Sequence, residues 1–471
     1  MPSKKRTLNM AGKLTLGFVS LAASVLPCLS DGTGTNQPSW PSRPLSLADS
    51  INFALQQNGA IQRGKSDLEA QYGVVVQTRA IVVPKVQANG NYQYSTEVQA
   101  YPIPNIPPSA NFPGIPGIPA INNSWAANIQ VVETIYQGGQ ITSSLRVATL
   151  TKDQALLQYQ TVIADSLLQV RVGYYDVLLA AEEVVVEEAS VGLLKQQLDD
   201  QQRRYGAGTV PRFNVLQAEV ALANERPRLI QARNSYRISK NNLVNLLGFR
   251  LPPEVLQDVP MELTDKLDAE PYEIELPVAI AKAFENRSEL ASARKSQDLR
   301  KEGVIGANSN YKPVVQLVGG YGARNSEFDA DPGYTVHGVN AGAQFTWSIF
   351  DGFMTKGKVD EAKAQYQGSK VDVDNEVRSI ELEVRTDFSN FLEARETLES
   401  QKKVQEEAEE ALRLARARNG AGAGTQLDVL SAETSLTQAR STQVQALHDY
   451  DVARARLERA MGVNIMQTSQ K

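Results

Sequence analysis

The sequence predicts a mixed fold, in which long α-helical hairpins, duplicated in tandem, are joined to four strands of a membrane β-barrel. Three observations indicate it: an internal repeat, unbroken segments with helical spacing of apolar residues, and short segments that alternate between apolar and polar residues. The 471-residue chain is 42% hydrophobic and 21% charged, with a net charge of −5. This balance is sufficient to bury a core, and nothing in it indicates a nucleic-acid partner.

The repeat is clearest where YGAGTVPRFNVLQAEV (205–220) matches NGAGAGTQLDVLSAET (419–434). Gly420 follows Gly206 by 214 residues, and the same offset links the later motifs NLLG and RAMG. Upstream the offset is 229, because the first copy carries a Pro/Gly-rich insertion at 101–123. The repeat therefore divides the chain into five parts. These are a signal peptide (1–30), a first repeat (31–248), a linker or equatorial segment (249–277), a second repeat (278–462) and a C-terminal tail (463–471).

Each copy is expected to contain a helix, two strands, a long helix, a glycine turn and a second helix. Apolar residues from Ile163 to Val184 recur in steps of four and three, which is typical of coiled-coil-like packing. No strong break interrupts about 140–205, so this helix should be about 100 Å long. Its partner at 214–247 is shorter, contains Pro227 and is expected to bend there. The segment 45–82 could stack end to end with that partner.

Four segments of about ten residues have an apolar face and a face of small polar residues, as membrane barrel strands do. They lie at 85–94, 124–132, 314–322 and 337–350. A half-buried soluble sheet alternates in the same way. Four strands cannot close a barrel, and lipid does not tolerate an open sheet edge, so several chains would have to build one together. Three chains would supply twelve strands.

The N-terminus has the features of a secretory signal peptide. Three basic residues at 4–6 precede a largely apolar stretch at 11–26, and small residues favour cleavage after Ser30. Cys28 is the only cysteine, and a lipid-anchored N-terminus at this residue is the alternative. Beyond residue 30 no stretch has the 18 or more apolar residues of a spanning helix.

Residue counts argue against an enzyme. The mature chain would lack cysteine, and its histidines are His337 and His448, which nearly excludes a thiol nucleophile, a His-based triad and a multi-His metal site. We expect no cofactor and no metal. The glycine turn before a helix suggests a phosphate loop, but it lacks the Gly-Lys-Ser/Thr ending that such a loop requires.

These elements together resemble the TolC-like outer membrane efflux protein family, or outer membrane factors. The resemblance covers nearly all of the mature sequence and rests on SLADSINFALQQN, AIVVPKVQANGNY, WSIFDGF and the two glycine turns with their terminal NLLG and RAMG. It implies a homotrimer in which four strands per chain form a 12-stranded outer-membrane β-barrel. The duplicated hairpins would form a trimeric periplasmic α-barrel.

The resemblance also assigns roles to both glycine turns. They would be periplasmic tips that dock a periplasmic adaptor, comprising Gly206, Ala207, Gly208 and Thr209 in the first copy and Gly420, Gly422, Gly424 and Thr425 in the second. The family's entrance carries two aspartates three positions apart; Asp428 matches the first, whereas Ser431 occupies the second. The family's gating arginine and tyrosine correspond to Gly424 and Asn419, so this chain departs from the pattern there.

Asp428 has a second interpretation, because an acidic residue in the first turn of a helix is favoured by the helix dipole. Threefold symmetry would turn one inward Asp428 into a ring of three carboxylates, which selects cations in pores. Its first-copy equivalent is the neutral Asn214, so the constriction would alternate Asp and Asn. The arginines at 413, 416 and 418 and the glutamate runs of the long helices are read as solvated faces.

The function implied is a passive exit duct of a tripartite efflux or type I secretion system. Its partners would be copies of itself, a periplasmic adaptor (membrane fusion) protein, an inner-membrane pump of the RND, ABC or MFS type, and outer-membrane lipid. The alternatives are a structural periplasmic coiled-coil protein that does not enter the membrane, and a lipid-anchored efflux lipoprotein of the same family. The sequence does not identify the transported substrate.

Overall fold

The structure is a computed structural model that describes residues 44–94, 123–250, 258–325 and 335–463. All of them belong to one compact unit that begins at Arg43. The expected signal peptide with Ser30 and Cys28, nearly all of the Pro/Gly-rich insertion and nearly all of the C-terminal tail lie outside these residues. Within the described ranges, none of the helices combines the length and apolar character of a membrane span.

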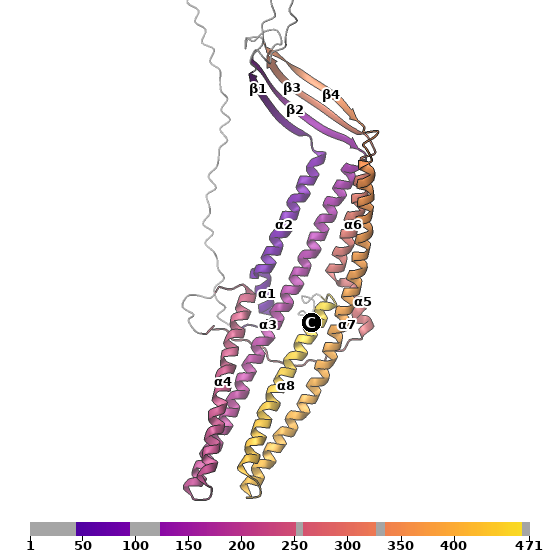
Figure 1. The fold of residues 1–471 in the computed structure, drawn as a ribbon. Helices are drawn as coiled ribbons and strands as arrows, with labels where there is room; N and C mark the ends of the chain where they lie inside the picture. The colour runs from indigo at the N-terminus through magenta and orange to yellow at the C-terminus, as the bar shows by residue number, and fades with distance from the viewer. Residues whose placement is uncertain (1–43, 95–122, 251–257, 326–334, 464–471) are drawn as a thin grey trace, which may run out of the picture. The chain divides into compact units, whose positions relative to one another are not determined.

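The same elements occur twice along the chain (Figure 1). The first set is α1 (Leu47–Gln57), α2 (Gly59–Arg79), the 3₁₀ turn η1 (Ala80–Val82), β1 (Lys85–Tyr94), β2 (Asn123–Gln137), α3 (Gln140–Gly206) and α4 (Arg212–Leu247). The second is α5 (Leu276–Asn286), α6 (Ser288–Ser309), β3 (Val314–Asn325), β4 (Thr335–Thr346), α7 (Met354–Gly420) and α8 (Gln426–Ala460). Both long helices contain 67 residues, and so each is about 100 Å long.

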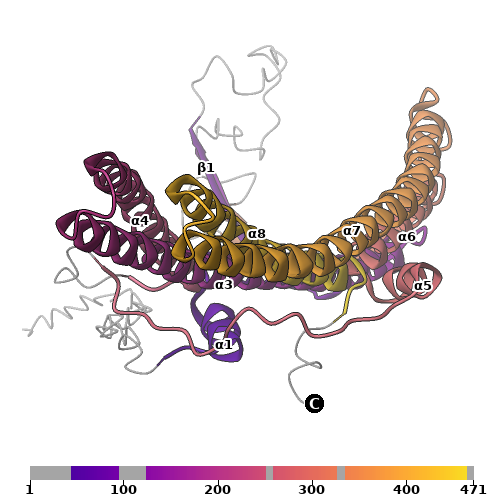
Figure 2. The same cartoon turned by 90° about the horizontal axis from the view of Figure 1, so that it is seen from below.

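The two long helices are each covered by two shorter helices placed one beyond the other. Helix α3 packs against α4 along one part of its length and against α2 along the other, and α7 packs likewise against α8 and α6. Contacts of α3 with α8 and α6 join the two copies side by side. Viewed from the tips, the helices follow one another as α4, α3, α8 and α7 in one layer (Figure 2).

The helix expected over 45–82 is divided into α1 and α2 by Asn58. The Asn58 side chain caps α2 by accepting from the backbone N–H of Ala60 at 2.9 Å and of Ile61 at 3.2 Å. Its amide donates to the carbonyl of Leu246, at the end of α4, at 2.6 Å. The end-to-end stacking is therefore made by α2 and α4. A Cβ at Gly248, which follows α4, would lie 2.3 Å from the carbonyl oxygen of Gln57.

The four strands form one antiparallel sheet in the order β1-β2-β3-β4. Its middle pair joins the two copies, with Ile129 opposite Tyr321. Strand β4 ends at Thr346, short of the segment 337–350 expected from alternation. The alternation continues past the last backbone pair, where the indole N–H of Trp347 donates to the carbonyl of Tyr311 at 3.0 Å.

The segment 258–275 contains no helix and runs across the middle of the helices (Figure 1). Its Glu262 accepts from the backbone N–H of Leu45 at 2.8 Å, and its Tyr272 packs edge-on against Phe391 with ring centroids 5.8 Å apart. Tyr450 donates its hydroxyl to the carbonyl of Glu270 at 2.7 Å. These contacts bind the linker to both copies. Helix α4 runs through Pro227 without interruption.

Candidate functional site

The two tips, each joining the two helices of one hairpin, have the same backbone geometry. In the first, Gly208 donates to the carbonyl of Tyr205 at 2.9 Å and Thr209 to that of Arg204 at 2.9 Å. In the second, the residues 214 positions later repeat both bonds, at 3.1 and 2.9 Å. Both tips are Schellman-type helix ends, which satisfy the last carbonyl groups of a helix when a left-handed residue follows it.

The tip glycines differ in what they contribute. Gly208 and Gly422 have φ angles of +74° and +75°, which only glycine adopts without strain. Gly424 is confined by packing, because an added Cβ would lie 3.1 Å from the backbone nitrogen of Asn419. Gly206 and Gly420 are the last residues of α3 and α7, and a Cβ there would meet nothing within 4 Å. The left-handed backbone therefore requires one glycine in each copy, and packing further restricts Gly424 in the second.

Asp428 and Thr425 form a reciprocal cap at the start of α8. The backbone N–H of Thr425 donates to the Asp428 carboxylate at 2.8 Å, and the N–H of Asp428 donates to the Thr425 hydroxyl at 3.2 Å. Hydrogen bonds from Thr425, first from its backbone and then from its side chain, lower the pKa of Asp428, and Arg418 adds a smaller effect. The carboxylate is therefore charged at neutral pH.

The first copy has no such cap, because Pro211 stands where the second copy has Thr425. Asp428 and Ser431 are both exposed on α8 within a single chain, and Asn214 is half-buried. Asn419 donates its side-chain amide to the carbonyl of Gly424 at 3.3 Å. Gly424 and Asn419, which the resemblance matched to a gating arginine and tyrosine, thus bond to each other within the turn.

One of the arginines read as a solvated face has a different role. Arg413 pairs on the surface of α7 with Glu410 at 2.6 Å. Arg416, in contrast, reaches across the hairpin to the buried Glu433 of α8 at 2.8 Å. Sequence spacing gave no signal for this contact, because the two residues lie on different helices.

A row of polar contacts, which we call the α3–α8 seam, joins the two hairpins of the chain. Along it, Arg171 pairs with Glu458 at 2.7 Å, and both side chains are less than a tenth exposed. Its other contacts are Asp165 with Arg459, Asp176 with His448, Ser190 with Thr437 and Gln197 with Gln426. Sequence reasoning missed every contact of this row, since charges in a seam recur at the same spacing as charges facing solvent.

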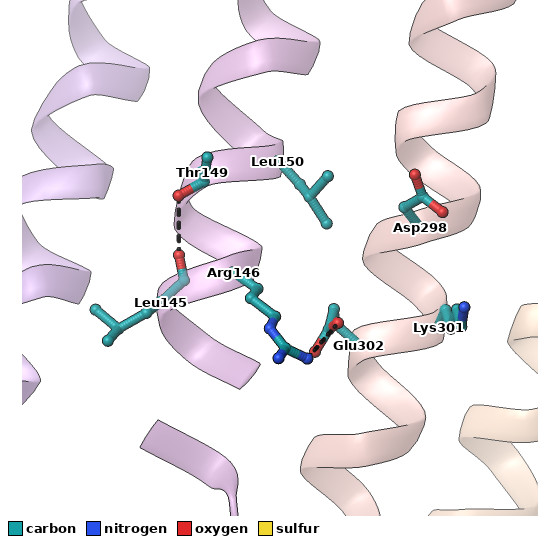
Figure 3. Close-up of a pocket in the computed structure, with 7 residues that line it drawn as sticks. All are labelled: Leu145, Arg146, Thr149, Leu150, Asp298, Lys301 and Glu302. Carbon is teal, nitrogen blue, oxygen red and sulfur yellow. Dashed lines mark hydrogen bonds and ion pairs between the residues drawn. The ribbon is translucent and has the colours of Figure 1, made fainter. Parts of the chain in front are cut away.

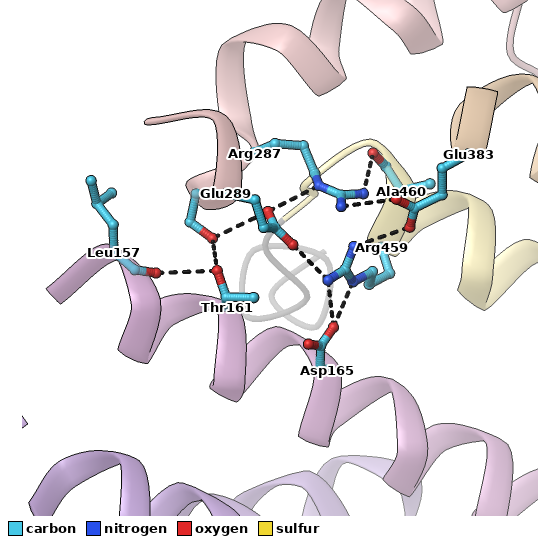
Figure 4. Close-up of polar contacts among 9 residues, drawn as sticks. Leu157, Thr161, Asp165, Arg287, Glu289, Glu383, Arg459 and Ala460 are labelled. Atoms are coloured by element: carbon cyan, nitrogen blue, oxygen red, sulfur yellow. Dashed lines mark hydrogen bonds and ion pairs between the residues drawn. The ribbon is translucent and has the colours of Figure 1, made fainter. Parts of the chain in front are cut away.

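One end of the seam is a network of five charged residues (Figure 4). Arg459 contacts Asp165 at 2.8 Å, Glu289 at 2.6 Å and Glu383 at 3.1 Å. Arg287, at the break between α5 and α6, shares Glu289 and Glu383 with it. Burial favours the uncharged form of Glu289, but a hydrogen bond from its own backbone and the charges of Arg287 and Arg459 outweigh this effect and lower the pKa of Glu289. The network therefore fastens α3, α6, α7 and α8 together.

A cavity of roughly 490 Å³ lies between α3 and α6, near the sheet (Figure 3). Arg146 pairs there with Glu302 at 3.4 Å, and Thr149 donates to the carbonyl of Leu145 at 3.2 Å. The other lining residues are Leu150, Asp298 and Lys301, so the cavity walls hold no histidine, cysteine or paired acid and base. Among the described residues, no cluster of three or more His, Cys, Asp or Glu side chains is arranged to hold a metal ion.

Two long helical hairpins joined to one four-stranded sheet are the architecture of an outer-membrane channel. The model of the family described as outer membrane efflux protein matches residues 50–249 and 279–463. The chain belongs to the outer membrane efflux protein family. The TolC-like resemblance, the mixed helix-and-strand fold class and the outer-membrane location expected from the sequence are thereby confirmed.

Individual relatives and solved structures agree with this assignment. Outer membrane protein TolC of Escherichia coli K12 is 24% identical over 89% of this chain and 83% of its own length. The alkaline protease secretion protein AprF of Pseudomonas aeruginosa is 24% identical over 66% and 64%. Among solved structures, CusC, studied for transmembrane channel formation, superposes with a TM-score of 0.73 at 16% identity, covering 89% of this chain and 92% of its own.

Proposed function

We propose that three copies of this chain assemble into an exit duct of a tripartite efflux or type I secretion system. The twelve strands would close a barrel in outer-membrane lipid, and the hairpins would form a tunnel through the periplasm. The duct is passive, without catalysis or a cofactor, and is driven by an inner-membrane pump of the RND, ABC or MFS type through a periplasmic adaptor. The chain would be divided into the five parts that its repeat predicts, and residues 249–277 would form the equatorial segment.

The sheet supports assembly into a closed structure. Every described residue of β4 is exposed in the single chain, including Val339 at 81% and Phe345 at 64%. In the described part of the chain, β1 and β4 each pair with one strand only, so each leaves an edge. An open edge with apolar side chains is unstable in lipid, and β4 of one copy pairing with β1 of the next would remove it.

The observation that carries the proposal is an apolar stripe that is buried in one copy and exposed in the other. Leu430, Val444 and Val452 of α8 are at most 9% exposed. The residues 214 positions earlier on α4, Leu216, Ile230 and Ile238, are also apolar, yet they are 47%, 64% and 51% exposed. Helix α8 packs between α7 and α3, whereas α4 packs only along α3 among the long helices. Helix α7 of a second copy would supply the missing neighbour.

The same arrangement assigns roles to the tips and the entrance. The tips at 206–209 and 420–425 lie at the ends of the hairpins, where a periplasmic adaptor could dock (Figure 1). The exposed Asp428 and Ser431 lie about one and about two helical turns beyond the second tip. With three copies around an axis, Asp428 would form a carboxylate ring at the entrance and Asn214 would stand between its members.

A single substitution on the stripe tests the assembly. Ile230→Glu places a charge where the second copy would pack, so the variant should lose the trimer that resists sodium dodecyl sulfate before heating. Gln231→Glu introduces the same group at the adjacent, exposed position and should leave the trimer intact. A wild-type chain recovered as a soluble periplasmic monomer would refute the proposal in favour of a structural coiled-coil protein.

A further inference from the structure

His448 of α8 joins the two hairpins of a chain through two carboxylates. Its Nε2 lies 2.9 Å from the Asp176 carboxylate of α3, and its Nδ1 lies 3.1 Å from the Asp449 carboxylate of α8. The residue is only 8% exposed. A carboxylate accepts hydrogen bonds and donates none, so both contacts are hydrogen bonds only when both ring nitrogens carry a proton and the imidazole is a cation.

The surroundings of the ring hold further charged groups. From α3, Glu183 faces it besides Asp176, and from α8, Asp451 faces it besides Asp449. Helix α7 contributes Asp387 and Glu393, and α8 contributes Arg456, to a cavity of roughly 390 Å³ that His448 lines. The excess of acidic groups favours the protonated ring, and the cavity offers space for the ring or water to move.

Proton loss changes this contact qualitatively. A neutral imidazole has one N–H, so one of the two carboxylates would face a nitrogen lone pair and the bond to it would be lost. Burial opposes the charge, but the hydrogen bonds that the ring donates to Asp176 and Asp449 outweigh it and raise the pKa of His448 above its ordinary value. The bridge is therefore complete below the ordinary pKa of histidine and is lost as the pH rises through the raised value.

A neighbouring carboxyl responds in the same direction. Burial raises the pKa of Asp451 to about 7, although Arg454, Arg171 and His448 each oppose the rise. A raised carboxyl pKa means that the folded chain favours the protonated form, so this contribution also weakens as the pH rises toward 7. Both groups therefore stabilise the contact between α3 and α8 more strongly in acid than in base.

We propose that Asp176 and His448 form a proton-dependent latch that holds the two helical hairpins of one chain together and releases them as the pH rises. Because both residues belong to the same chain, the latch does not depend on the trimer proposed above. It lies about 30 residues, or roughly 45 Å, from the first tip, so it acts on the hairpins well above their ends.

The chain contains its own neutral version of this pair. At the offset of 214 residues, Asn390 of α7 corresponds to Asp176, and Asn234 of α4 corresponds to His448. Neither asparagine gains or loses a proton near neutral pH. The duplication therefore has polar residues at both sets of positions, but only the set on α3 and α8 includes a group, His448, that titrates near neutral pH. The double variant Asp176→Asn, His448→Asn transplants the neutral pair into the latch.

Proton affinity is measured first, on the full-length protein. Hydrogen–deuterium exchange at the imidazole carbon, followed by mass spectrometry, reports the pKa of His448 and of His337, the other histidine, in one digest. In Asp176→Asn the pKa of His448 should fall, because the negative charge that favours the protonated ring is lost. An unchanged value would show that the Asp176 contact does not hold the proton, and would overturn the proposal.

Hairpin separation is measured second. Spin labels at Ala189→Cys on α3 and Gln438→Cys on α8, both exposed and on the tip side of the latch, with Cys28→Ser, give a distance distribution by pulsed electron resonance. It should broaden between about pH 5.5 and about pH 8.5 in the otherwise wild-type chain, and it should broaden less in the double variant, which keeps only the contribution of Asp451. An equal response in both, or no response in the former, would refute the latch.

Discussion

The buried pair of Arg171 and Glu458 makes a strong prediction about stability. Glu458→Gln keeps the shape of the side chain but leaves the guanidinium of Arg171, whose side chain is 8% exposed, without its charged partner. Removing one member of a buried pair typically costs about 3–5 kcal/mol, because the remaining charge stays buried without compensation. In the unfolding equilibrium this is roughly a hundredfold to a few thousandfold per chain.

The matched control is Glu410→Gln on α7. Glu410 also binds an arginine at close range, Arg413 at 2.6 Å, but both side chains are more than half exposed. Exposed pairs contribute little, because water and salt screen them. The control should therefore unfold at nearly the guanidinium chloride concentration of the wild type.

The assay is unfolding of the detergent-solubilised protein in guanidinium chloride, followed by the helical circular dichroism signal. A third variant, Arg171→Met with Glu458→Gln, removes the stranded charge and should recover part of the lost stability. If Glu458→Gln and Glu410→Gln shifted the midpoint equally, burial would not be what gives the pair its strength, and the reasoning about the α3–α8 seam would fail.

Three further predictions concern the tips. Pro211→Thr with Asn214→Asp should give α4 the cap that α8 has, stabilise its first turn by about 1 kcal/mol and slow amide exchange there; unchanged exchange would contradict it. Gly208→Ala should lower the free energy of unfolding by about 1–2 kcal/mol and lower the melting temperature, because the backbone of Gly208 is left-handed. Gly206→Ala should raise the melting temperature slightly, and equal effects of the two variants would count against the assigned geometry. Asp428→Asn should reduce the cation selectivity of single channels in planar bilayers, and unchanged selectivity in the variant would leave Asp428 as a helix cap only. The wild-type selectivity should persist from neutral pH into acid, because the lowered pKa keeps Asp428 charged until the pH falls below the ordinary pKa range of aspartate.

Periodicity and the internal repeat were sufficient to predict the long helices and the sheet, because each depends on local spacing. The helix expected over 140–205 matches α3 closely, and the strand expected over 85–94 matches β1. Helix boundaries set by contacts between distant segments were missed. Asn58 splits the first helix by capping α2, which the local sequence Asn58-Gly59 could have signalled, but the contact of its amide with the end of α4, 188 residues away, is recorded by no local pattern.

Charged residues were the least predictable part of the candidate site. His448 was counted as evidence against an enzyme, and its contact with Asp176 became visible only once α3 and α8 lay side by side. Arg416 was likewise assigned to solvent, although it pairs with the buried Glu433. Helical spacing specifies which residues share a face of a helix, but not whether that face meets water or another helix.

Native mass spectrometry of the protein extracted from the outer-membrane fraction tests the central claim most directly. We expect the wild type and Gln231→Glu to be recovered from that fraction with three times the mass of the mature chain. Ile230→Glu should not show this trimeric mass. A chain found in the soluble periplasmic fraction with the mass of one copy would contradict the exit duct and every role assigned through threefold symmetry.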